Sequence, residues 1–346
     1  MKKRIFVLFD VPDDQNDKQW LIDGLSDMYP GKVCSVSINY VLSQLIMIRG
    51  GISRIYAYLI IIRQCIRTII KSGKGDIILC WFSTTGKIMN LISRLLGNNR
   101  HIISMNWLNP GGKKHGFHYQ LARYAITNPM CTIVVNTSTS LPKWNQFMDY
   151  ERNDYIVVPD VYDDTVPFEK CNRLFNNTFF SGGYGNRDWS LFVTLAKQNP
   201  DCKFICVARK EDFISKVDMN EIPYNLDYYF NTSEKEYYSL MRESSVVVLP
   251  IIGNTISGLV NIIRAAQYGL LCCVSRTDST YQYYSSINKN LVVENNIYDW
   301  QQTIERLKSM SNQDFLNCEI DFQKHIKDNF SPSHAVSIIS ERINKF

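Results

Sequence analysis

The feature that most constrains the fold is a regular alternation of short apolar runs with longer amphipathic runs along the chain. Such alternation is typical of β-α-β units, in which helices connect and cover parallel strands. In the first half the expected strands are Arg4–Phe9, Lys32–Ile38, Asp76–Trp81, His101–Asn106, Cys131–Asn136 and Tyr155–Pro159. The helices expected between them are Ile52–Lys71, Gly86–Leu96 and Phe117–Ile126.

A polar stretch, Asp160–Asn177, interrupts this rhythm as an expected interdomain linker, and the alternation then resumes. The later strands are Thr178–Ser181, Lys203–Ala208, Ser245–Pro250 and Leu270–Ser275, and the helices Trp189–Gln198, Lys235–Glu243, Gly258–Tyr268 and Pro332–Phe346. A chain of 346 residues exceeds one typical core. We predict an α/β protein with two Rossmann-like, doubly wound domains, 1–165 and 166–330, facing a central cleft. Residues 331–346 are expected to form a helix that packs back toward the first domain.

The composition indicates a cytoplasmic chain in a reducing compartment. The first apolar run is too short for a signal-peptide core, and the longest one, Ile55–Ile62, is far short of the roughly 18 residues of a membrane span. The ten cysteines include no pair with metal-ligand spacing, and several lie in apolar, strand-like runs, where a free thiol behaves as a small hydrophobe.

Charge is distributed unevenly. From Met28 to Met148 the chain holds 14 basic residues and a single acid, Asp76. A field this one-sided favours an anionic partner for the first domain, such as a phospholipid surface or a lipid pyrophosphate. A solvated basic surface explains the same composition equally well. No recognised nucleic-acid module is present, so we expect no nucleic-acid partner.

The segment Gly51–Lys74 carries apolar residues at helical spacing: Ile52, Ile55, Leu59, Ile62, Ile66, Ile69 and Ile70. Basic residues occupy other positions: Arg54, Arg63, Arg67, Lys71 and Lys74. The favoured interpretation is a crossover helix whose apolar face covers the sheet. The alternative is an amphipathic helix that lies on anionic lipid, with the basic edge toward the membrane.

Two segments of the second half carry candidate chemistry. In the first, an expected strand runs into Gly182 and Gly183 and then into a helix preceded by Arg187 and Asp188. Glycines permit close backbone approach, the helix N-terminus attracts anions, and Arg187 is placed to contact a phosphate. The glycine spacing is not that of a dinucleotide-binding motif, and Asp188 alone is explained as a helix cap.

In the second segment a buried strand ends at Pro250, and after a polar loop Ser257 and Gly258 open an apolar helix. Ser257 is a suitable N-cap residue, and the N–H groups of Gly258 and Leu259 are then available to a diphosphate.

The order of these segments carries a family resemblance. It comprises Phe179–Trp189, then Glu236–Met241, then Leu249-Pro250, Ser257-Gly258 and Ala265–Gly269, then Cys273–Ser275. Over Thr178–Asp299 this order resembles the donor domain of GT-B glycosyltransferases, most closely the family-4-like bacterial group that builds surface polysaccharides such as capsule or O-antigen.

The resemblance implies roles for particular residues. In that group the Ser-Gly turn and its helix hold the diphosphate of a nucleotide sugar, and a basic residue after the Gly-rich turn contacts the same phosphates. Ser257, Gly258 and Arg187 take those positions here, with Arg209 or Lys210 as weaker candidates. The resemblance implies a UDP- or GDP-sugar as co-substrate, no permanently bound cofactor and no metal.

The sequence departs from the group at one point. Many retaining members carry two glutamates, separated by seven residues, that bind the donor sugar and ribose. Here the positions fall on Ile256 and Arg264, and Asp278 is the only carboxylate between Ser245 and Val293. The departure leaves open the donor, the stereochemistry and activity itself; Arg264 is expected to face a phosphate or to bridge to the opposite domain.

The acceptor half has fewer signals. Asp10 and Asp13 follow the first strand, where a carboxylate can act as general base toward an acceptor hydroxyl, although polar loop residues are common there. His115 is an alternative base in a basic loop.

We expect a hexosyl- or related transferase acting on a glycan or lipid-pyrophosphate-linked acceptor, peripheral to the inner face of the cell membrane. The alternative is a non-catalytic GT-B partner that docks another transferase at the membrane; an epimerase is a third option without a matching residue set.

Overall fold

The structure, a computed structural model, describes residues 3–9, 19–37, 51–97, 100–108, 110, 114–152, 154–172, 174–183, 185–285, 287 and 289–346. The chain divides into two compact units. One unit comprises Met1–Pro159 together with Pro332–Phe346, and the other comprises Asp160–Ser331. Each unit is built around its own six-stranded sheet.

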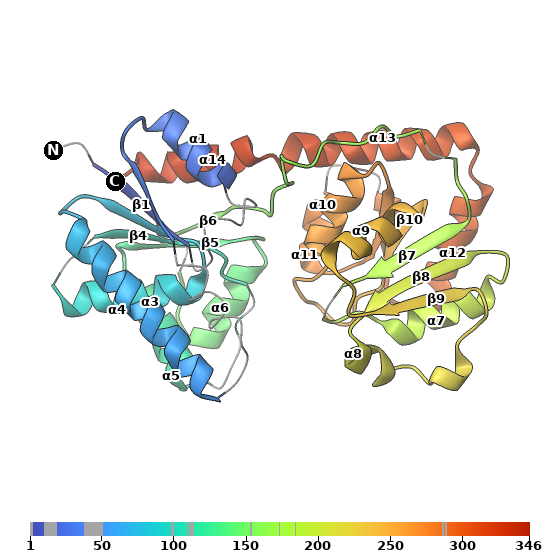
Figure 1. Cartoon of the computed structure of the whole chain (residues 1–346), viewed down its shortest axis with the longest axis horizontal. Helices are drawn as coiled ribbons and strands as arrows, with labels where there is room; N and C mark the ends of the chain where they lie inside the picture. The colour runs from blue at the N-terminus through green and yellow to red at the C-terminus, as the bar shows by residue number, and fades with distance from the viewer. Residues whose placement is uncertain are drawn as a thin grey trace. The chain divides into compact units, whose positions relative to one another are not determined.

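The sheet of the first unit is parallel throughout, in the order β2-β1-β3-β4-β5-β6. Its strands are β1 (Ile5–Leu8), β2 (Val33–Val36), β3 (Ile77–Cys80), β4 (His101–Ser104), β5 (Cys131–Val135) and β6 (Tyr155–Val157). The helices are α1 (Gln19–Met28), α3 (Gly51–Lys71), α4 (Ser83–Leu95), α5 (Phe117–Ile126), α6 (Ser140–Met148) and α14 (Pro332–Ile343). Figure 1 shows α1 and α14 on one face of this sheet and α3, α4 and α5 on the other.

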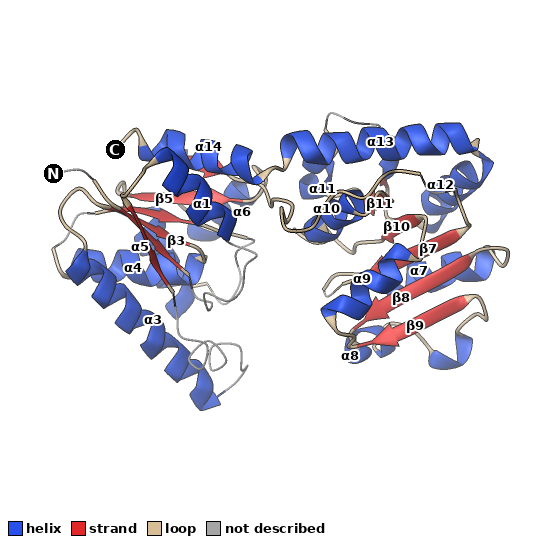
Figure 2. Ribbon diagram, turned by 45° about the horizontal axis from the view of Figure 1, so that its top comes forward, coloured by secondary structure: helices blue, strands red, loops and turns tan. Residues whose placement is uncertain are grey.

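The sheet of the second unit is also parallel, in the order β12-β11-β10-β7-β8-β9. Its strands are β7 (Thr178–Gly182), β8 (Lys203–Ala208), β9 (Leu226–Phe230), β10 (Val246–Leu249), β11 (Leu271–Ser275) and β12 (Val292–Val293). The helices are α7 (Trp189–Gln198), α8 (Lys210–Ile214), α9 (Glu234–Arg242), α10 (Leu259–Gln267), α11 (Asp278–Tyr283), α12 (Ile297–Ser309) and α13 (Asn312–Asn329). Figure 2 shows these strands in red with helices around them.

Burial explains why the strands are continuous apolar runs in the sequence. Every residue of β1, β3, β5, β7, β10 and β11 is buried. A parallel sheet covered by helices on both faces has no solvent-facing side, so its strands do not alternate with polar residues. All ten cysteines lie in the described part of the chain and carry free thiols. Seven of them are buried, and the other three, Cys34, Cys171 and Cys318, are half-buried.

The polar segment that follows Pro159 packs against the second unit. Gln267 on α10 donates hydrogen bonds from its Nε2 to the carbonyl oxygens of Asp163, at 2.7 Å, and Val166, at 2.9 Å. The amide of Tyr162 donates to the carbonyl of Phe330 at the end of α13. Residues 160–172 are therefore held on the surface of this unit by hydrogen bonds to two of its helices.

The helix α14 completes the first unit from the far end of the chain. The hydroxyl of Tyr29, just after α1, donates to the carbonyl of Ser340, and Arg342 donates to Thr132 and Asp154. A Cβ on Gly24 would lie 2.6 Å from a methyl carbon of Val336, so α1 and α14 approach closely only because position 24 is glycine.

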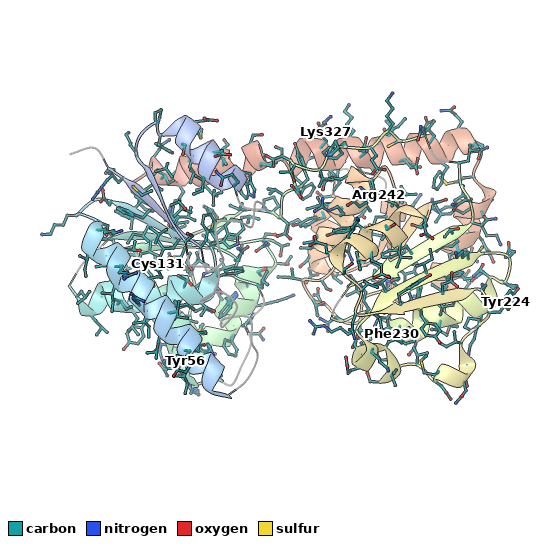
Figure 3. All side chains as sticks on the ribbon, in the orientation of Figure 1. Tyr56, Cys131, Tyr224, Phe230, Arg242 and Lys327 are labelled. Atoms are coloured by element: carbon teal, nitrogen blue, oxygen red, sulfur yellow. The ribbon has the colours of Figure 1, made fainter. Side chains whose placement is uncertain are left out.

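The side of α3 that packs on the sheet is not the one that the favoured interpretation of the sequence predicted. The residues that pack toward the rest of the unit are Ala57, Ile61, Cys65, Thr68 and Ile69. Four of the aliphatic residues assigned to the sheet, Ile55, Leu59, Ile66 and Ile70, are instead exposed. The helix is apolar on two opposite sides, and periodicity alone does not tell which side the sheet covers. Figure 3 labels Tyr56, another exposed residue of this helix.

No helix in the described ranges is long and apolar enough to cross a membrane.

Candidate functional site

The site emerges where the strand order of the second sheet changes direction, between β7 and β10. In open α/β sheets, ligands bind beyond the carboxyl ends of the strands at such a point. The two segments singled out in the sequence follow these two strands. The Gly-rich turn leaves β7, and the Ser257-Gly258 turn lies between β10 and α10.

Arg187 joins the two segments. Its side chain is buried, with the residue only 2% exposed. The Nε donates to the carbonyl of Gly182 at 2.9 Å, and the Nη1 donates to the hydroxyl of Ser257 at 2.8 Å. The Ser257 hydroxyl in turn donates to the carbonyl of Gly185 at 3.1 Å. The guanidinium therefore bonds the Gly-rich turn through its Nε and the Ser257-Gly258 turn through its Nη1.

Backbone pairing reinforces this junction. Arg187 and Ile251 form an isolated antiparallel bridge. The amide of Ile252 donates to the carbonyl of Asn186 at 2.8 Å, and the amide of Asp188 donates to the carbonyl of Pro250 at 3.0 Å. The Asp188 side chain caps α7 by accepting from the amide of Leu191 at 3.1 Å. These hydrogen bonds hold the loops after β7 and β10 against each other, next to the N-termini of α7 and α10.

The start of α10 corrects the expected cap. Gly258, with φ of 82°, is the N-cap residue, and Ser257 does not cap the helix because its hydroxyl is engaged by Arg187 and Gly185. No side chain at Gly258 can bond the first amides of the helix. The N–H groups of the first turn, beginning at Leu259, are left to an external acceptor, as helix N-termini offer to anions.

Asn261 and Tyr237 are two members of this site that the sequence did not identify. The Asn261 Nδ2 donates to the carbonyl of Gly182 at 3.0 Å and to the hydroxyl of Tyr237 at 2.8 Å. A Cβ on Gly182 would lie 2.5 Å from that hydroxyl, so glycine is needed at this position. In the sequence, Tyr237 stands out only as part of the segment Glu236–Met241 that carries the family resemblance, and Asn261 only as one residue of an expected apolar helix. Neither residue by itself indicates a binding site.

The electrostatics of Arg187 favour an anionic ligand. Burial lowers the pKa of Arg187, and within the described ranges no carboxylate hydrogen-bonds to its guanidinium. The Nη2 lies 2.9 Å from where a Cβ of Gly183 would be and 3.5 Å from where one of Gly258 would be. A cation thus sits between the two glycine turns, and a buried charge of this kind requires a partner of opposite sign.

Arg209 and Lys210 lie one strand away. They follow β8, the neighbour of β7, and both are exposed at the start of α8. Neither takes part in the hydrogen bonds described above between Arg187, Ser257 and the carbonyls of Gly182 and Gly185.

Arg264 occupies a separate cluster on the last turn of α10. Its Nη2 lies 3.4 Å from a carboxylate oxygen of Asp163, and its guanidinium lies 4.9 Å from the ring centroid of Tyr238 and 5.9 Å from that of Tyr268. Burial alone would lower the pKa of Arg264, but the two phenols and Asp163 outweigh it and raise the pKa. These partners belong to the same unit as Arg264.

The expected bases of the first domain are only partly described. Asp10 and Asp13 lie outside the described residues. His115 is exposed, has a φ of 67°, and packs its ring against Tyr119 with 5.0 Å between centroids. It belongs to the first unit, whereas the Arg187 junction belongs to the second. Within the described ranges no group of three or more His, Cys, Asp or Glu side chains is placed to hold a metal ion.

Comparison with known proteins identifies the fold. No family model and no curated protein matches the chain. Among solved structures, it is similar to the trehalose-6-phosphate synthase of E. coli with UDP-2-fluoroglucose bound, at a TM-score of 0.73 and 9% identity over 99% of each chain. It is also similar to HepE of Anabaena in complex with UDP and glucose, at 0.70 and 11% over 100% of each chain. A UDP-forming α,α-trehalose-phosphate synthase from Burkholderia vietnamiensis aligns at a TM-score of 0.69 and 10% identity, over 100% of this chain and 99% of that one. The chain has the GT-B fold, with two six-stranded parallel sheets.

Proposed function

We propose that the chain is a glycosyltransferase that moves a sugar from a nucleotide-diphosphate sugar to a hydroxyl group of a glycan or lipid-linked acceptor in polysaccharide assembly. The observation that carries the proposal is the buried Arg187, which joins the Gly-rich turn to the Ser257 turn at the switch point of the second sheet. The second unit would bind the donor, and the first would bind the acceptor.

In this proposal the junction stabilises the departing diphosphate. During transfer the bond from the anomeric carbon to the diphosphate breaks, and a bond to the acceptor oxygen forms. Negative charge develops on the diphosphate, where preorganised donors contribute most to catalysis. The Arg187 guanidinium and the uncapped amides of α10 are the donors available there. The acceptor proton passes to a base, for which Asp10, Asp13 and His115 are the candidates.

A uridine nucleotide is the favoured donor, because two of the similar structures contain one: UDP-2-fluoroglucose in the E. coli protein, and UDP in HepE. Isothermal titration calorimetry with UDP, GDP and CMP tests the proposal directly. We expect UDP or GDP to bind and CMP, which lacks a diphosphate, to bind at least roughly tenfold more weakly, since a charge-assisted contact is worth 1.5–3 kcal/mol. Equal affinity for all three would overturn the assignment of the junction as a diphosphate site.

One observation favours a second candidate, a non-catalytic partner that retains the fold. The position of the second glutamate in the resembling group is Arg264 here, and it is engaged by Asp163 and two tyrosines. Incubation of the purified protein with UDP-glucose and related sugars separates the two candidates. Release of UDP, accelerated by an acceptor, is expected of the transferase; nucleotide binding without any turnover is expected of the partner.

We propose further that the outward face of α3 rests on an anionic membrane surface, which would make the enzyme peripheral to the inner face of the cell membrane. Ile55, Leu59 and Ile70 are more than half exposed there, at 62%, 55% and 76%. On one flank lie Arg63, Arg67 and Lys71, exposed and without an acidic partner in the described ranges. An apolar stripe edged by cations is the pattern of helices that lie in the headgroup region.

The charge of the surrounding surface supports this placement. The single acid between Met28 and Met148, Asp76, is buried and bonded to Arg4 and to the amide of Gly73. Burial alone would raise the pKa of Asp76, but these hydrogen bonds outweigh it and lower the pKa. The cations near α3 therefore have no neighbouring exposed carboxylate from this stretch to neutralise them.

Co-sedimentation with vesicles tests the membrane surface. We expect binding to phosphatidylcholine vesicles that contain phosphatidylglycerol and little binding to phosphatidylcholine alone. The Arg63→Gln/Arg67→Gln variant should bind roughly 25-fold more weakly, because each basic residue near such a surface contributes about 1 kcal/mol. Leu59→Glu/Ile70→Glu should abolish binding, whereas Ile320→Glu, at an exposed isoleucine of α13, should not. Equal losses in all three variants would contradict the assignment to α3.

A further inference from the structure

Lys87 lies near the carboxyl end of β4 in the first sheet, next to Trp107, which follows that strand. It belongs to α4, the helix that starts three residues after β3 ends. A Cβ on the preceding Gly86 would lie 1.9 Å from the hydroxyl oxygen of Ser104, so glycine lets α4 pass close to the carboxyl end of β4. This close approach brings the lysine to the edge of the sheet at which α/β proteins bind ligands.

The side chain is enclosed by aromatic rings. Lys87 is only 8% exposed, and its Nζ lies 4.5 Å from the ring centroid of Trp107 and 4.9 Å from that of Trp144. Trp107 follows β4 and is fixed by a hydrogen bond from its Nε1 to Ser104, and Trp144 belongs to α6. Three segments distant in sequence thus meet around one ammonium group.

This ammonium has no anionic partner among the residues that the structure describes. Within the described ranges no oxygen accepts a hydrogen bond from Lys87 and no carboxylate forms an ion pair with it. The tryptophan faces attract a cation, but they do not replace acceptors for its three N–H groups. Burial lowers the pKa of Lys87 to about 8, so the group still carries a proton at neutral pH. A buried and unpaired charge is a marker of a functional site.

Two helix N-termini add to the positive field at this edge. The residues that precede α4 and α6, Phe82 and Thr139, make no capping hydrogen bond with their side chains. Lys87 lies in the second turn of α4, and its neighbour Trp144 lies in the second turn of α6. Helix N-termini favour anions.

We propose that Lys87 binds an anionic group of the acceptor, a phosphoryl or carboxylate group, at the carboxyl edge of the first sheet. The role in an acceptor site rests on the proposed transferase function; the binding of an anion at Lys87 does not. An anion placed here would accept the unused N–H donors and neutralise the charge that the fold has buried. The proposal narrows the acceptor to one that carries negative charge near the reacting hydroxyl.

The test is an anion titration with the donor site occupied. Inorganic phosphate and, in a second arm, acetate are added to the UDP-saturated protein while NMR follows the lysine Cε signals and their pH titration. We expect phosphate or acetate to raise the pKa of one lysine from about 8 toward the ordinary value. The Lys87→Met variant should lack that signal and lose at least roughly tenfold in affinity for the anion. The matched control Lys74→Met, at an exposed lysine of the same unit, should retain both.

The outcomes separate this inference from the proposed function. If Lys87→Met and the wild type bind phosphate equally, or Lys74→Met loses as much, the anion does not bind at Lys87 and the inference is wrong. If the protein does not bind UDP at all, the donor assignment fails, and the same comparison made without UDP still decides the Lys87 site. A loss of phosphate binding in Lys87→Met with unchanged UDP affinity supports both. The phosphate and acetate arms tell which class of anion the site prefers.

Discussion

Each unit of the molecule holds a buried cation beside the carboxyl end of a strand, Arg187 in the second unit and Lys87 in the first. The two differ in how they are held. Arg187 uses its planar fork to bond two backbone carbonyls and a hydroxyl, whereas Lys87 is surrounded by tryptophan rings. Arginine suits the first role because several fixed donors can organise two loops at once. Replacement of Arg187 by alanine would leave those carbonyls unsatisfied, so milder changes test the site better.

Ser257→Ala and Arg187→Lys are each expected to weaken UDP binding by roughly tenfold. Ser257→Ala removes the hydrogen bond that orients the guanidinium, and Arg187→Lys replaces the planar guanidinium with an ammonium that cannot bond both turns. Calorimetry measures the affinity, and thermal unfolding shows whether the fold survives. Ser309→Ala, at an exposed serine of α12, is the matched control. Unchanged UDP affinity in Ser257→Ala would remove the Arg187–Ser257 bond from the donor site.

Lys87→Met is expected to stabilise the protein at neutral pH. The folded pKa of Lys87, about 8, lies below the ordinary value of 10.5, so between these values the unfolded chain binds more protons and stability rises with pH. Below pH 8 the full burial cost is present, about 3 kcal/mol. No charged side chain of the described ranges contributes to this shift; Trp107 and Trp144 are the groups that face the ammonium. Chemical denaturation measures the unfolding free energy of both proteins. The excess stability of Lys87→Met over the wild type should be larger at neutral pH than above pH 10.

The sequence singled out the residues of the Arg187 junction, our proposed donor site, but it did not single out Lys87. Arg187, Ser257 and Gly258 lie in segments whose local order, a strand, a turn and then a helix, is typical of anion-binding turns. The structure brings the three residues together. Lys87 is one lysine in an amphipathic helix, and its burial depends on two tryptophans from distant segments. No local pattern encodes such a meeting.

At the scale of elements, buried parallel strands were predicted most accurately. The continuous apolar runs identified β3, β8 and β10 to within one or two residues at each end. The sequence missed β9 and the helices α12 and α13, because β9 lies at the sheet edge and is only partly buried and the two helices have largely polar exposed faces. It also misjudged α3, where two apolar sides left the orientation undetermined.

Gly258→Ala tests the turn that starts α10. Its φ of 82° is strained for any residue with a Cβ, and the added carbon would lie 3.3 Å from a methyl carbon of Leu249. We expect a loss of about 1–2 kcal/mol in unfolding free energy and weaker UDP binding, because the helix amides shift away from the Arg187 junction. Gly97→Ala, at a positive-φ glycine with open space around it, is the control for backbone strain alone. A loss of UDP affinity in both variants would contradict a specific role for the turn.

At the scale of the whole molecule, the chain enters the second unit after Pro159 and returns to the first at Pro332. The first unit is therefore assembled from two separate stretches of chain. Buried residues of α14 that close it include Ala335, Val336 and Ile339. The second unit, in contrast, is one continuous stretch.

Deletion of Pro332–Phe346 should affect the two units differently. We expect the second unit to keep its UDP affinity and the first to lose stability, since α1 loses the helix packed against it and Asp154 loses its bond to Arg342. Hydrogen–deuterium exchange should rise in α1, β5 and β6 and stay unchanged in β7, β8 and β10. Uniform protection across the shortened chain would show that α14 contributes little.

The return of α14 also has a consequence during synthesis. Domains usually fold in the order in which they leave the ribosome, the N-terminal one first. Here α14 is synthesised only after the whole second unit. Until then one face of the first sheet lacks the helix that covers it, while the second unit is already free to fold. The unit that begins first is completed last, and the nascent chain carries an unfinished apolar surface for as long as it takes to make Asp160–Ser331.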